Sequence, residues 1–344
     1  MSTQADQLSV VIITRNEEKN IARTLESVLH AVEHRPPTEI IVVDSASQDQ
    51  TIEIAKQYPV NIVRLHPSWV MTAAAGRYIG TYYTQSDLIL YLDGDMEFFK
   101  EWLDDALSFM AAHPDVVGVS GIVQDVHLED GQIIAKQAPV IKPASEPMPV
   151  KHFGGAALYR RVALEQVGGF NPYIVSDEEP ELCIRLRHAG YTLILLPRKV
   201  CHHYCIPQKS LLGHLRRAKM NYFLGFGQIP RYHLGTPLFR QYLVERGSYL
   251  VYLLAMVITV ITFLLTLLSG NLLFFGTWLV IVIAFLLVYL IKKRSLRAVA
   301  LGLLFETLTA LNAVRGFLRT PIPPEDYPTD AEIIQVRYHR GKLA

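Results

Sequence analysis

The chain has 344 residues, 50% of them apolar, and its 33 basic and 32 acidic side chains leave a net charge of +1. The sequence has no extended basic, aromatic-rich stretch of the kind that binds nucleic acid, which excludes that class. Its three cysteines suit a reducing compartment better than a disulfide framework. The length accommodates a catalytic domain of about 200 to 250 residues plus a further segment. The apolar run at residues 10–13 is too short for a signal-peptide core, so we expect no export.

The first hundred residues predict a parallel sheet covered by helices, because short apolar runs alternate with segments of helical periodicity. Asn16 is expected to cap the helix that follows the first strand. Another helix is expected around residues 102–110, where apolar side chains recur at helical spacing. The expected strands are 8–14, 39–43, 60–65 and 88–92.

The next hundred residues are expected to complete this domain. A strand at 116–122 precedes residues 124–151, whose proline, glycine and polar content predicts an excursion or loop of the kind that covers active sites. A helix follows Gly154–Arg161 and ends near Val167. An acidic cluster at 177–181 begins another helix, since Pro180 is acceptable in a first turn, and the last strand is expected at 191–196.

Two apolar stretches predict transmembrane helices at residues 249–268 and 272–291, because each has twenty residues without a formal charge. Only residues 269–271 separate them, so they form a hairpin whose outer ends lie on one side of the membrane. The positive-inside rule makes that side cytoplasmic, which leaves the catalytic domain in the cytosol. The basic residues that flank the hairpin are Arg231, Arg240, Arg246, Lys292, Lys293, Arg294 and Arg297.

Three further segments surround this hairpin. Residues 209–226 mix apolar side chains with Arg216, Arg217 and Lys219, which predicts a helix lying on the anionic leaflet, with an ordinary surface helix as the alternative. They end a cytosolic domain of residues 1–227, and a juxtamembrane linker of residues 228–248 follows. Residues 298–318 are apolar but interrupted by charges. We favour an interfacial or partly re-entrant helix there, because a third span would export the basic tail at 319–344.

The acidic pair Asp93 and Asp95 carries the main chemical signal of the sequence. A buried apolar strand ends in Asp93-Gly94-Asp95, which brings two carboxylates close together at a turn. Carboxylate oxygens are hard ligands suited to Mg²⁺ or Mn²⁺, ions that keep open positions for substrate phosphates. An ordinary acidic turn is the competing interpretation, since Asp-Gly pairs are common in turns.

Polar residues also end two other predicted strands, at Thr14 and Asp44. In open parallel sheets, ligands bind beyond the carboxyl ends of the strands, so we expect Thr14, Asp44 and Asp93 to converge. Ser47 and Asp49 follow Asp44 and are interpreted as helix-capping residues rather than ligand contacts.

Four segments together resemble a family 2 glycosyltransferase in order and spacing, and the resemblance covers about residues 8–227. It implies a GT-A fold, a nucleotide-sugar-binding α/β sandwich with a mostly parallel sheet, and an inverting transferase of the membrane-anchored bacterial type. By the resemblance, Thr14, Asn16 and Glu17 belong to the nucleotide pocket. The four segments are Val11–Glu17, Val42–Thr51, Ala75–Gly80 and Leu92–Asp95.

The resemblance also implies roles at the centre of the site. Asp44 accepts a hydrogen bond from the nucleotide base, Arg77 contacts the nucleotide, Asp93 contacts the ribose or the metal, and Asp95 is the main metal ligand. Glu179 stands at the place of the catalytic base, although Glu replaces the family's Asp. Glu178 and Asp177 therefore stay open as alternatives, as does a merely solvated acidic helix start.

Residues 201–205, Cys-His-His-Tyr-Cys, contain good zinc ligands. A strand turns successive side chains to opposite faces and no second cysteine pair follows, so we do not predict structural zinc. By the resemblance, His202 or His203 reaches the metal or diphosphate. Gly154 and Gly155 lie on the acceptor side, with tight packing as the alternative. Trp69 either stacks on a sugar or, as we favour, fills the core.

These features predict a membrane-anchored, Mn²⁺- or Mg²⁺-dependent enzyme that moves a sugar from a UDP- or GDP-type donor to a membrane-held, polyprenyl-linked acceptor. The expected location is the cytoplasmic face of a bacterial inner membrane. A polyprenyl phosphate is the alternative acceptor. A nucleotidyltransferase is disfavoured because residues 14–20 contain no glycine for a triphosphate loop. A non-catalytic scaffold with a degenerate transferase domain is the remaining alternative.

Overall fold

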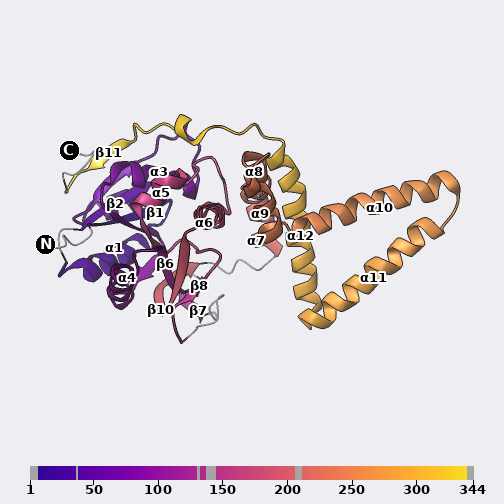
Figure 1. Cartoon of the computed structure of the whole chain (residues 1–344), viewed down its shortest axis with the longest axis horizontal. Coiled ribbons are helices and arrows are strands. Elements are labelled where there is room, and N and C mark those ends of the chain that lie inside the picture. Colours follow the sequence, from indigo (N-terminus) through magenta and orange to yellow (C-terminus); the bar gives the residue numbers. More distant parts are fainter. Residues whose placement is uncertain (1–6, 36–37, 130–131, 137–144, 206–210, 339–344) are drawn as a thin grey trace. The chain divides into compact units, whose positions relative to one another are not determined.

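A computed structural model of the chain describes residues 7–35, 38–129, 132–136, 145–205 and 211–338 (Figure 1). The chain divides into two compact units: unit 1 comprises residues 1–207 and 322–344, and unit 2 comprises residues 208–321. Parts of three predicted segments lie outside the described residues: 130–131 and 137–144 of the expected loop, 209–210 of the expected interfacial helix, and 339–344 of the basic tail.

Unit 1 begins with alternating strands and helices, as the sequence pattern predicts. Its elements up to residue 205 are β1 (Leu8–Thr14), α1 (Ile21–Val32), β2 (Glu39–Asp44), α2 (Thr51–Ala55), β3 (Asn61–Arg64), α3 (Ala73–Tyr83), β4 (Leu88–Asp93), β5 (Met96–Phe98), α4 (Lys100–Ala112), β6 (Val116–Glu129), β7 (Gln132–Lys136), β8 (Met148–Pro149), β9 (Ala157–Arg160), α5 (Arg161–Val167), α6 (Glu178–His188) and β10 (Thr192–Cys205).

These strands and β11 (Glu332–Gln335) form one mixed sheet in the order β11-β3-β2-β1-β4-β9-β6-β10-β5, with β7 beside β6 and β8 beside β10. Strands β3, β2, β1 and β4 are parallel, whereas β9 is antiparallel to both β4 and β6. The parallel half carries the continuous apolar runs seen in the sequence, because strands covered by helices on both faces bury every side chain.

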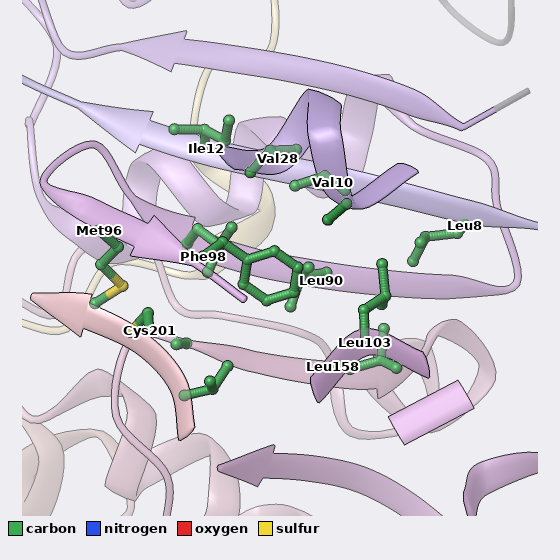
Figure 2. Packing of buried hydrophobic residues seen from close by; sticks show 14 of the residues in the cluster. Leu8, Val10, Ile12, Val28, Leu90, Met96, Phe98, Leu103, Leu158 and Cys201 are labelled. Atoms are coloured by element: carbon green, nitrogen blue, oxygen red, sulfur yellow. The ribbon is translucent and has the colours of Figure 1, made fainter. Parts of the chain in front are cut away.

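Alternation along β1 divides the core into two layers, since successive side chains of a strand point to opposite faces. Val10 and Ile12 join a cluster with α1 and α4, whereas Val11 and Ile13 join a cluster with α3, α5 and α6. Figure 2 shows the first cluster, in which Val28 of α1 and Leu103 of α4 lie against the strands. The sheet therefore lies between two helical layers.

Several local predictions differ from the structure. Residues 124–129 and 132–136 are not part of a loop: β6 continues to Glu129 and β7 pairs with it antiparallel. A short strand, β9, precedes α5. Asn16 does not cap α1, which begins at Ile21; instead its backbone has a positive φ of 57°. Cross-strand pairing, which local patterns do not encode, extends β6 and β10 through polar residues.

The sequence-based interpretation of residues 319–344 as a tail misses a strand. The chain returns to unit 1 through η2 (Pro324–Asp326) and β11 (Glu332–Gln335), and β11 pairs antiparallel with β3. Tyr327 is buried in the α3 layer. This strand covers the edge of β3, which would otherwise expose unpaired backbone groups.

Unit 2 is helical throughout its described residues. The predicted apolar hairpin is present, with a left-handed Gly270 ending its first helix. In the described residues, three helices (α10, α11 and α12) are long and apolar enough to cross a membrane. The elements are α7 (Leu211–Lys219), η1 (Tyr222–Leu224), α8 (Gly225–Tyr232), α9 (Pro237–Arg246), α10 (Tyr249–Ser269), α11 (Leu273–Lys293) and α12 (Leu296–Phe317).

Candidate active site

The carboxyl ends of β1, β2 and β4 meet at one edge of the sheet, as expected for a parallel arrangement. Thr14 is in register with Asp44, and its neighbour Ile13 is in register with Asp93. Gly94 follows Asp93 and lies so close to β1 that a Cβ atom there would be 2.7 Å from Thr14 Oγ1. Three polar strand ends therefore line a single site, and Gly94 permits their close approach.

Asp44 is fully buried at this edge. Its Oδ2 accepts a hydrogen bond from the Ser47 amide at 2.9 Å, and Arg64 Nε lies 3.6 Å away. Burial raises the pKa of Asp44, although the bonds from Ser47 and the charge of Arg64 oppose the shift. Asp44 Oδ1 is buried and has no hydrogen-bond partner among the described residues. This oxygen can accept an N–H group from a ligand.

The loop after β1 is tied to the loop after β2. The Asn16 amide donates to Ser47 Oγ at 2.8 Å, while Asn16 Oδ1 accepts from the Gln48 amide at 2.8 Å. Asp49 accepts from the Thr51 amide at the start of α2, but the N-cap residue of α2 is Gln50, so the predicted N-cap role of Ser47 and Asp49 is wrong. The Ser47 hydroxyl instead accepts from the Asn16 amide. Asn16 thus shapes the pocket through the backbone of residues 47 and 48.

Glu17 follows on the same loop and is largely withdrawn from solvent. Burial raises its pKa to about 7, with Asp95 and Asp93 adding to the shift and Asn20 opposing it. Its carboxylate accepts a hydrogen bond from Asn20 Nδ2 at 2.8 Å. Glu17 therefore belongs to the acidic environment of the site, close enough to the Asp93–Asp95 pair for their charges to raise its pKa.

Arg77 of α3 lies at the centre of a buried charge cluster. It is 1% exposed, and its guanidinium contacts three carboxylates: Asp93 at 2.8 Å, Glu178 at 2.7 Å and Glu179 at 3.1 Å. The arrangement connects the end of β4 to the start of α6. The cluster thereby joins residues that are more than eighty positions apart in the chain.

The three acidic side chains of this cluster all have pKa values above their usual range. Burial raises the pKa of Glu178 to about 8, and the charge of Glu179 adds to the shift. Burial also raises the pKa of Glu179 and of Asp93, although Arg77 opposes both shifts. Glu178 has a side chain 7% exposed, whereas that of Glu179 is 18% exposed. Glu179 is therefore the more accessible of the two glutamates.

Asp95 faces His203 of β10. His203 Nε2 lies 3.2 Å from Asp95 Oδ2, and its Nδ1 lies 2.9 Å from Asp125 Oδ1 on the neighbouring strand β6. Asp125 and His203 are paired in register, which brings their side chains to one face. Burial disfavours the charged imidazole, but the bonds to Asp125 and Asp95 raise the pKa of His203.

A divalent cation fits this corner of the site. Asp95 Oδ1 is buried and has no hydrogen-bond partner among the described residues, so it retains ligand capacity. Asp125, His203 and Cys205 also bring one ligand atom each to within 4.8 Å of one another. Oxygen ligands beside one imidazole suit Mn²⁺ or Mg²⁺.

The alternation of side chains along β10 decides which of the two histidines, His202 or His203, reaches Asp95. His202 points to the opposite face, where its Nδ1 lies 3.2 Å from Glu97 and its ring contacts Phe99. Cys201 is buried in the first core cluster and does not join Cys205. The structure therefore brings His203, and not His202, to Asp95.

The residues predicted on the acceptor side separate into two groups. A Cβ atom at Gly155 would lie 2.5 Å from Asp93 Oδ2 and 3.1 Å from Arg77 Nη2, whereas Gly154 faces open space. Trp69 packs edge-on against Tyr327, with ring centroids 5.7 Å apart, in agreement with the core interpretation. Gly155 thus belongs to the Asp93 cluster.

Two residues of the site were missed by the sequence reasoning. Arg64 is the last residue of β3 and is in register with Asp44. A basic residue near the end of a predicted strand is the sequence feature that could have identified it. Asp125 lies in the segment expected to be a loop, and only its pairing with β10 reveals its position.

The known proteins to which this chain is similar in sequence are glycosyltransferases. Residues 9–168 match the profile of Glycosyl transferase family 2. Glycosyltransferase AglE of Haloferax volcanii is 26% identical over 236 residues, which is 67% of this chain and 75% of AglE. Poly(ribitol-phosphate) beta-N-acetylglucosaminyltransferase TarS of Staphylococcus aureus is 32% identical over 111 residues, but these cover 31% of this chain and only 19% of TarS.

Solved structures agree with the fold. Mannosyltransferase PcManGT from Pyrobaculum calidifontis, solved with GDP-Man and Mn²⁺, superposes with a TM-score of 0.58 at 18% identity, covering 92% of this chain and 88% of that chain. The TarS fragment solved with UDP-GlcNAc gives a TM-score of 0.53 at 19% identity, with 71% and 75% coverage. The mixed α/β sheet is therefore of the GT-A type.

Proposed function

We propose that this chain moves a sugar, with inversion, from a UDP- or GDP-type nucleoside diphosphate sugar to a membrane-associated, polyprenyl-linked acceptor in polysaccharide or glycolipid synthesis. The match of residues 9–168 to the profile of Glycosyl transferase family 2 supports the proposal. One observation carries the proposal. Asp95 Oδ1 is buried and has no hydrogen-bond partner among the described residues, and Asp95 lies beside His203 at the sheet edge where the strands carrying Asp44 and Asp93 end.

The nucleotide occupies the pocket at the ends of β1 and β2. Asp44 Oδ1 accepts a hydrogen bond from the base, because it is buried without a partner among the described residues. Thr14 Oγ1 is also buried without a hydrogen-bond partner among the described residues, and it offers the nucleotide a second polar contact. Asn16 and Glu17 shape this pocket, and Arg64 holds the pocket loop through a bond to the Ser47 carbonyl at 2.9 Å.

Asp95 and His203 would hold the divalent cation, with Asp93 beside them. When bound, the ion supplies positive charge for the diphosphate as it departs. Asp125 accepts a hydrogen bond from His203 Nδ1, so the lone pair of Nε2 can point toward the ion. Asp93 is held by Arg77 in a fixed orientation.

Glu179 is the general base of the proposed reaction. It accepts the proton of an acceptor hydroxyl while that oxygen bonds to the anomeric carbon and the bond to the nucleoside diphosphate breaks. A pKa raised by burial suits this role, because a base operates best with a pKa near the working pH. Glu178 is more deeply buried and is bonded to Arg77, so we give it the role of orienting the guanidinium.

The membrane part of the proposal rests on the apolar helices α10 and α11 and on the basic residues around them. We place the catalytic unit on the cytoplasmic face of a bacterial inner membrane. An anchored enzyme gains most from an acceptor that is itself confined to the membrane, where tethering raises its effective concentration. A polyprenyl phosphate is the second candidate acceptor.

Donor binding is the first test. The full chain in detergent is unfolded thermally with UDP, GDP, dTDP or CMP, with and without Mn²⁺. Ligand at 100 times its dissociation constant stabilises by about 2.7 kcal/mol, which corresponds to about 5 to 11 °C in a domain of this size. Stabilisation by one diphosphate that requires Mn²⁺ is expected for the wild type and for the control Asp105→Ala, but not for Asp95→Ala.

The contrary outcomes are distinct. If no diphosphate stabilises the chain, the scaffold alternative replaces the transferase. If Asp95→Ala keeps the Mn²⁺ dependence, the proposed ion site is wrong. Transfer from the donor so identified is then compared for the wild type and Glu179→Gln: near-complete loss indicates a hydroxyl acceptor, whereas retained transfer indicates a phosphate, whose oxygen needs little base assistance.

A further inference from the structure

The return of the chain to unit 1 restricts how unit 2 can cross a membrane. Unit 1 contains residues before 208 and residues after 321, so the helical unit is an insertion with both ends in one folded body. A folded sheet lies on one side of a bilayer. The number of membrane crossings between Pro207 and Ile322 is therefore even.

The returning segment is an integral part of unit 1. Asn61 Oδ1 accepts hydrogen bonds from the amides of Arg337 at 2.8 Å and Tyr338 at 3.0 Å. Gln335 donates to the carbonyls of Tyr58 and Val60. These bonds extend the β11–β3 pairing, which would be lost if the segment lay across the membrane.

Tyr327 attaches the segment at a second point. Its ring is 2% exposed and packs edge-on against Trp69, Tyr78 and Tyr173. Its hydroxyl donates to the Val70 carbonyl at 2.6 Å. The returning segment is therefore held at two separate sites, by the pairing of β11 with β3 and by the buried ring of Tyr327.

Three helices are long enough to cross, and an even count leaves one of them out. In the most apolar stretch of α10 and α11, 6% and 0% of the residues are buried in the structure, whereas the corresponding value for α12 is 28%. Helix α12 also contains Glu306, Asn312 and Arg315, which are costly in hydrocarbon. The helix that does not cross is therefore α12.

Contacts inside unit 2 place α12 at the open end of the α10–α11 hairpin. A Cβ atom at Gly302 would lie 2.5 Å from the hydroxyl of Tyr289, which is near the end of α11. Glu306 accepts a hydrogen bond at 3.3 Å from Ser248, the residue just before α10. The middle of α12 thus meets the last turns of α11 and the start of α10, not the centre of the hairpin.

The remainder of α12 packs against the short helices of unit 2. Gly227 of α8 lies against the Ala313 carbonyl, and Gly316 of α12 lies against the Leu224 carbonyl, so the two backbones touch where only glycine fits. Phe305 packs against Phe223 and His214. These contacts fix α12 to η1, α7 and α8, which precede the hairpin in the chain.

We infer that α10 and α11 cross the bilayer once each and that α12 lies with α7 on the surface of the cytoplasmic leaflet. This inference rests on the membrane part of the proposed function. Exposed apolar side chains on both helices provide the contact with lipid, and three cations of α7 suit anionic headgroups. The exposed apolar residues are Leu211, Leu212 and Leu215 on α7, and Leu296, Leu311 and Val314 on α12.

Cysteine accessibility tests the crossing number. Full-length Gln57→Cys, Asn271→Cys and Thr320→Cys variants are treated in intact and permeabilised spheroplasts with a membrane-impermeant maleimide, with the wild type as the blank. All three positions are exposed. Only Asn271→Cys should be labelled in intact spheroplasts, and all three after permeabilisation. Labelling of Thr320→Cys without permeabilisation means three crossings and overturns the inference.

A depth measurement tests the surface position of α12. Spin labels at Leu311→Cys and at the control Ile261→Cys in α10 are compared in bilayers, in a background where Cys205 is replaced by Ser. A water-soluble relaxation agent should collide with the label at Leu311 several-fold more often than with the label at Ile261. If both labels instead collide mainly with oxygen, which dissolves in the bilayer, and do so to the same extent, the inference is contradicted. Neither experiment depends on donor binding, so failure here leaves the transferase proposal separately testable.

Discussion

Removing Arg77 is expected to destabilise unit 1 strongly. The guanidinium is 1% exposed and contacts Asp93, Glu178 and Glu179, so Arg77→Met leaves three acidic groups without their cation. Breaking a buried ion pair by removing one partner costs about 3 to 5 kcal/mol. In a domain of 150 to 250 residues, each kcal/mol lowers Tm by about 2 to 4 °C, so we expect Tm to fall by about 6 to 20 °C.

The cost should depend on pH. Because burial raises the pKa of Glu178 and Glu179, both can take up a proton when the cation is lost, and this neutralisation is complete in acid. We therefore expect a smaller fall in Tm at pH 5 than at pH 8. Arg77→Met with Glu178→Gln should recover part of the loss at pH 8, because one fewer carboxylate is left unpaired.

Thermal unfolding of the full chain in detergent at one scan rate measures this effect. Arg198→Met is the matched control, because Arg198 pairs with Asp105 at a site where both side chains are about half exposed. Surface pairs contribute about 0 to 1 kcal/mol, so the control should change Tm by no more than about 4 °C. A fall for Arg77→Met no larger than the control's, or one independent of pH, would refute the buried-cluster reasoning.

Three further outcomes are expected. Asp125→Ala should weaken Mn²⁺ binding about 10- to 100-fold in an EPR titration, because the imidazole it orients loses its partner; unchanged affinity would exclude Asp125 from the ion site. Glu178→Gln should make the fall in Tm between pH 5 and pH 9 less steep. Because burial raises the pKa of Glu178 to about 8, its protonated form stabilises the fold fully below about pH 4.5, and this contribution is lost as the pH rises through 8. An equally steep fall would contradict this. Gly155→Ala should abolish diphosphate-induced stabilisation by displacing Asp93, whereas Gly154→Ala should keep it, and similar behaviour of the two would argue against the packing role.

The parts of the fold that local sequence encodes were predictable. Strands β1, β2 and β4 are continuous apolar runs, and α1 and α4 carry a helical stripe, so their positions follow from composition and period. Strand β11 did not follow, because four residues near the C-terminus become a strand only by pairing with β3, some 270 positions earlier. Long-range pairing of short segments leaves no local signal.

The candidate site also has parts that the local sequence predicts and parts that it does not. The positions of Asp44, Asp93 and Asp95 follow from strands that end in polar residues. The choice between His202 and His203 required the register of β10 against β5 and β6, and a shift of one residue would have reversed it. Identities of site residues are thus readable from the sequence, whereas their orientations depend on register.

The charge balance of the site supports the proposed use of a divalent cation. Arg77 was expected to contact the nucleotide, but its guanidinium contacts Asp93, Glu178 and Glu179, and these contacts stabilise its charge so far that its pKa is raised despite burial. Its positive charge is therefore already balanced by the protein. A nucleoside diphosphate brought to Asp95 meets further negative charge, and repulsion between like charges at low dielectric costs several kcal/mol. Under the proposed function, positive charge would therefore enter with the donor, and we propose Asp95 as its ligand, because its Oδ1 has no hydrogen-bond partner among the described residues.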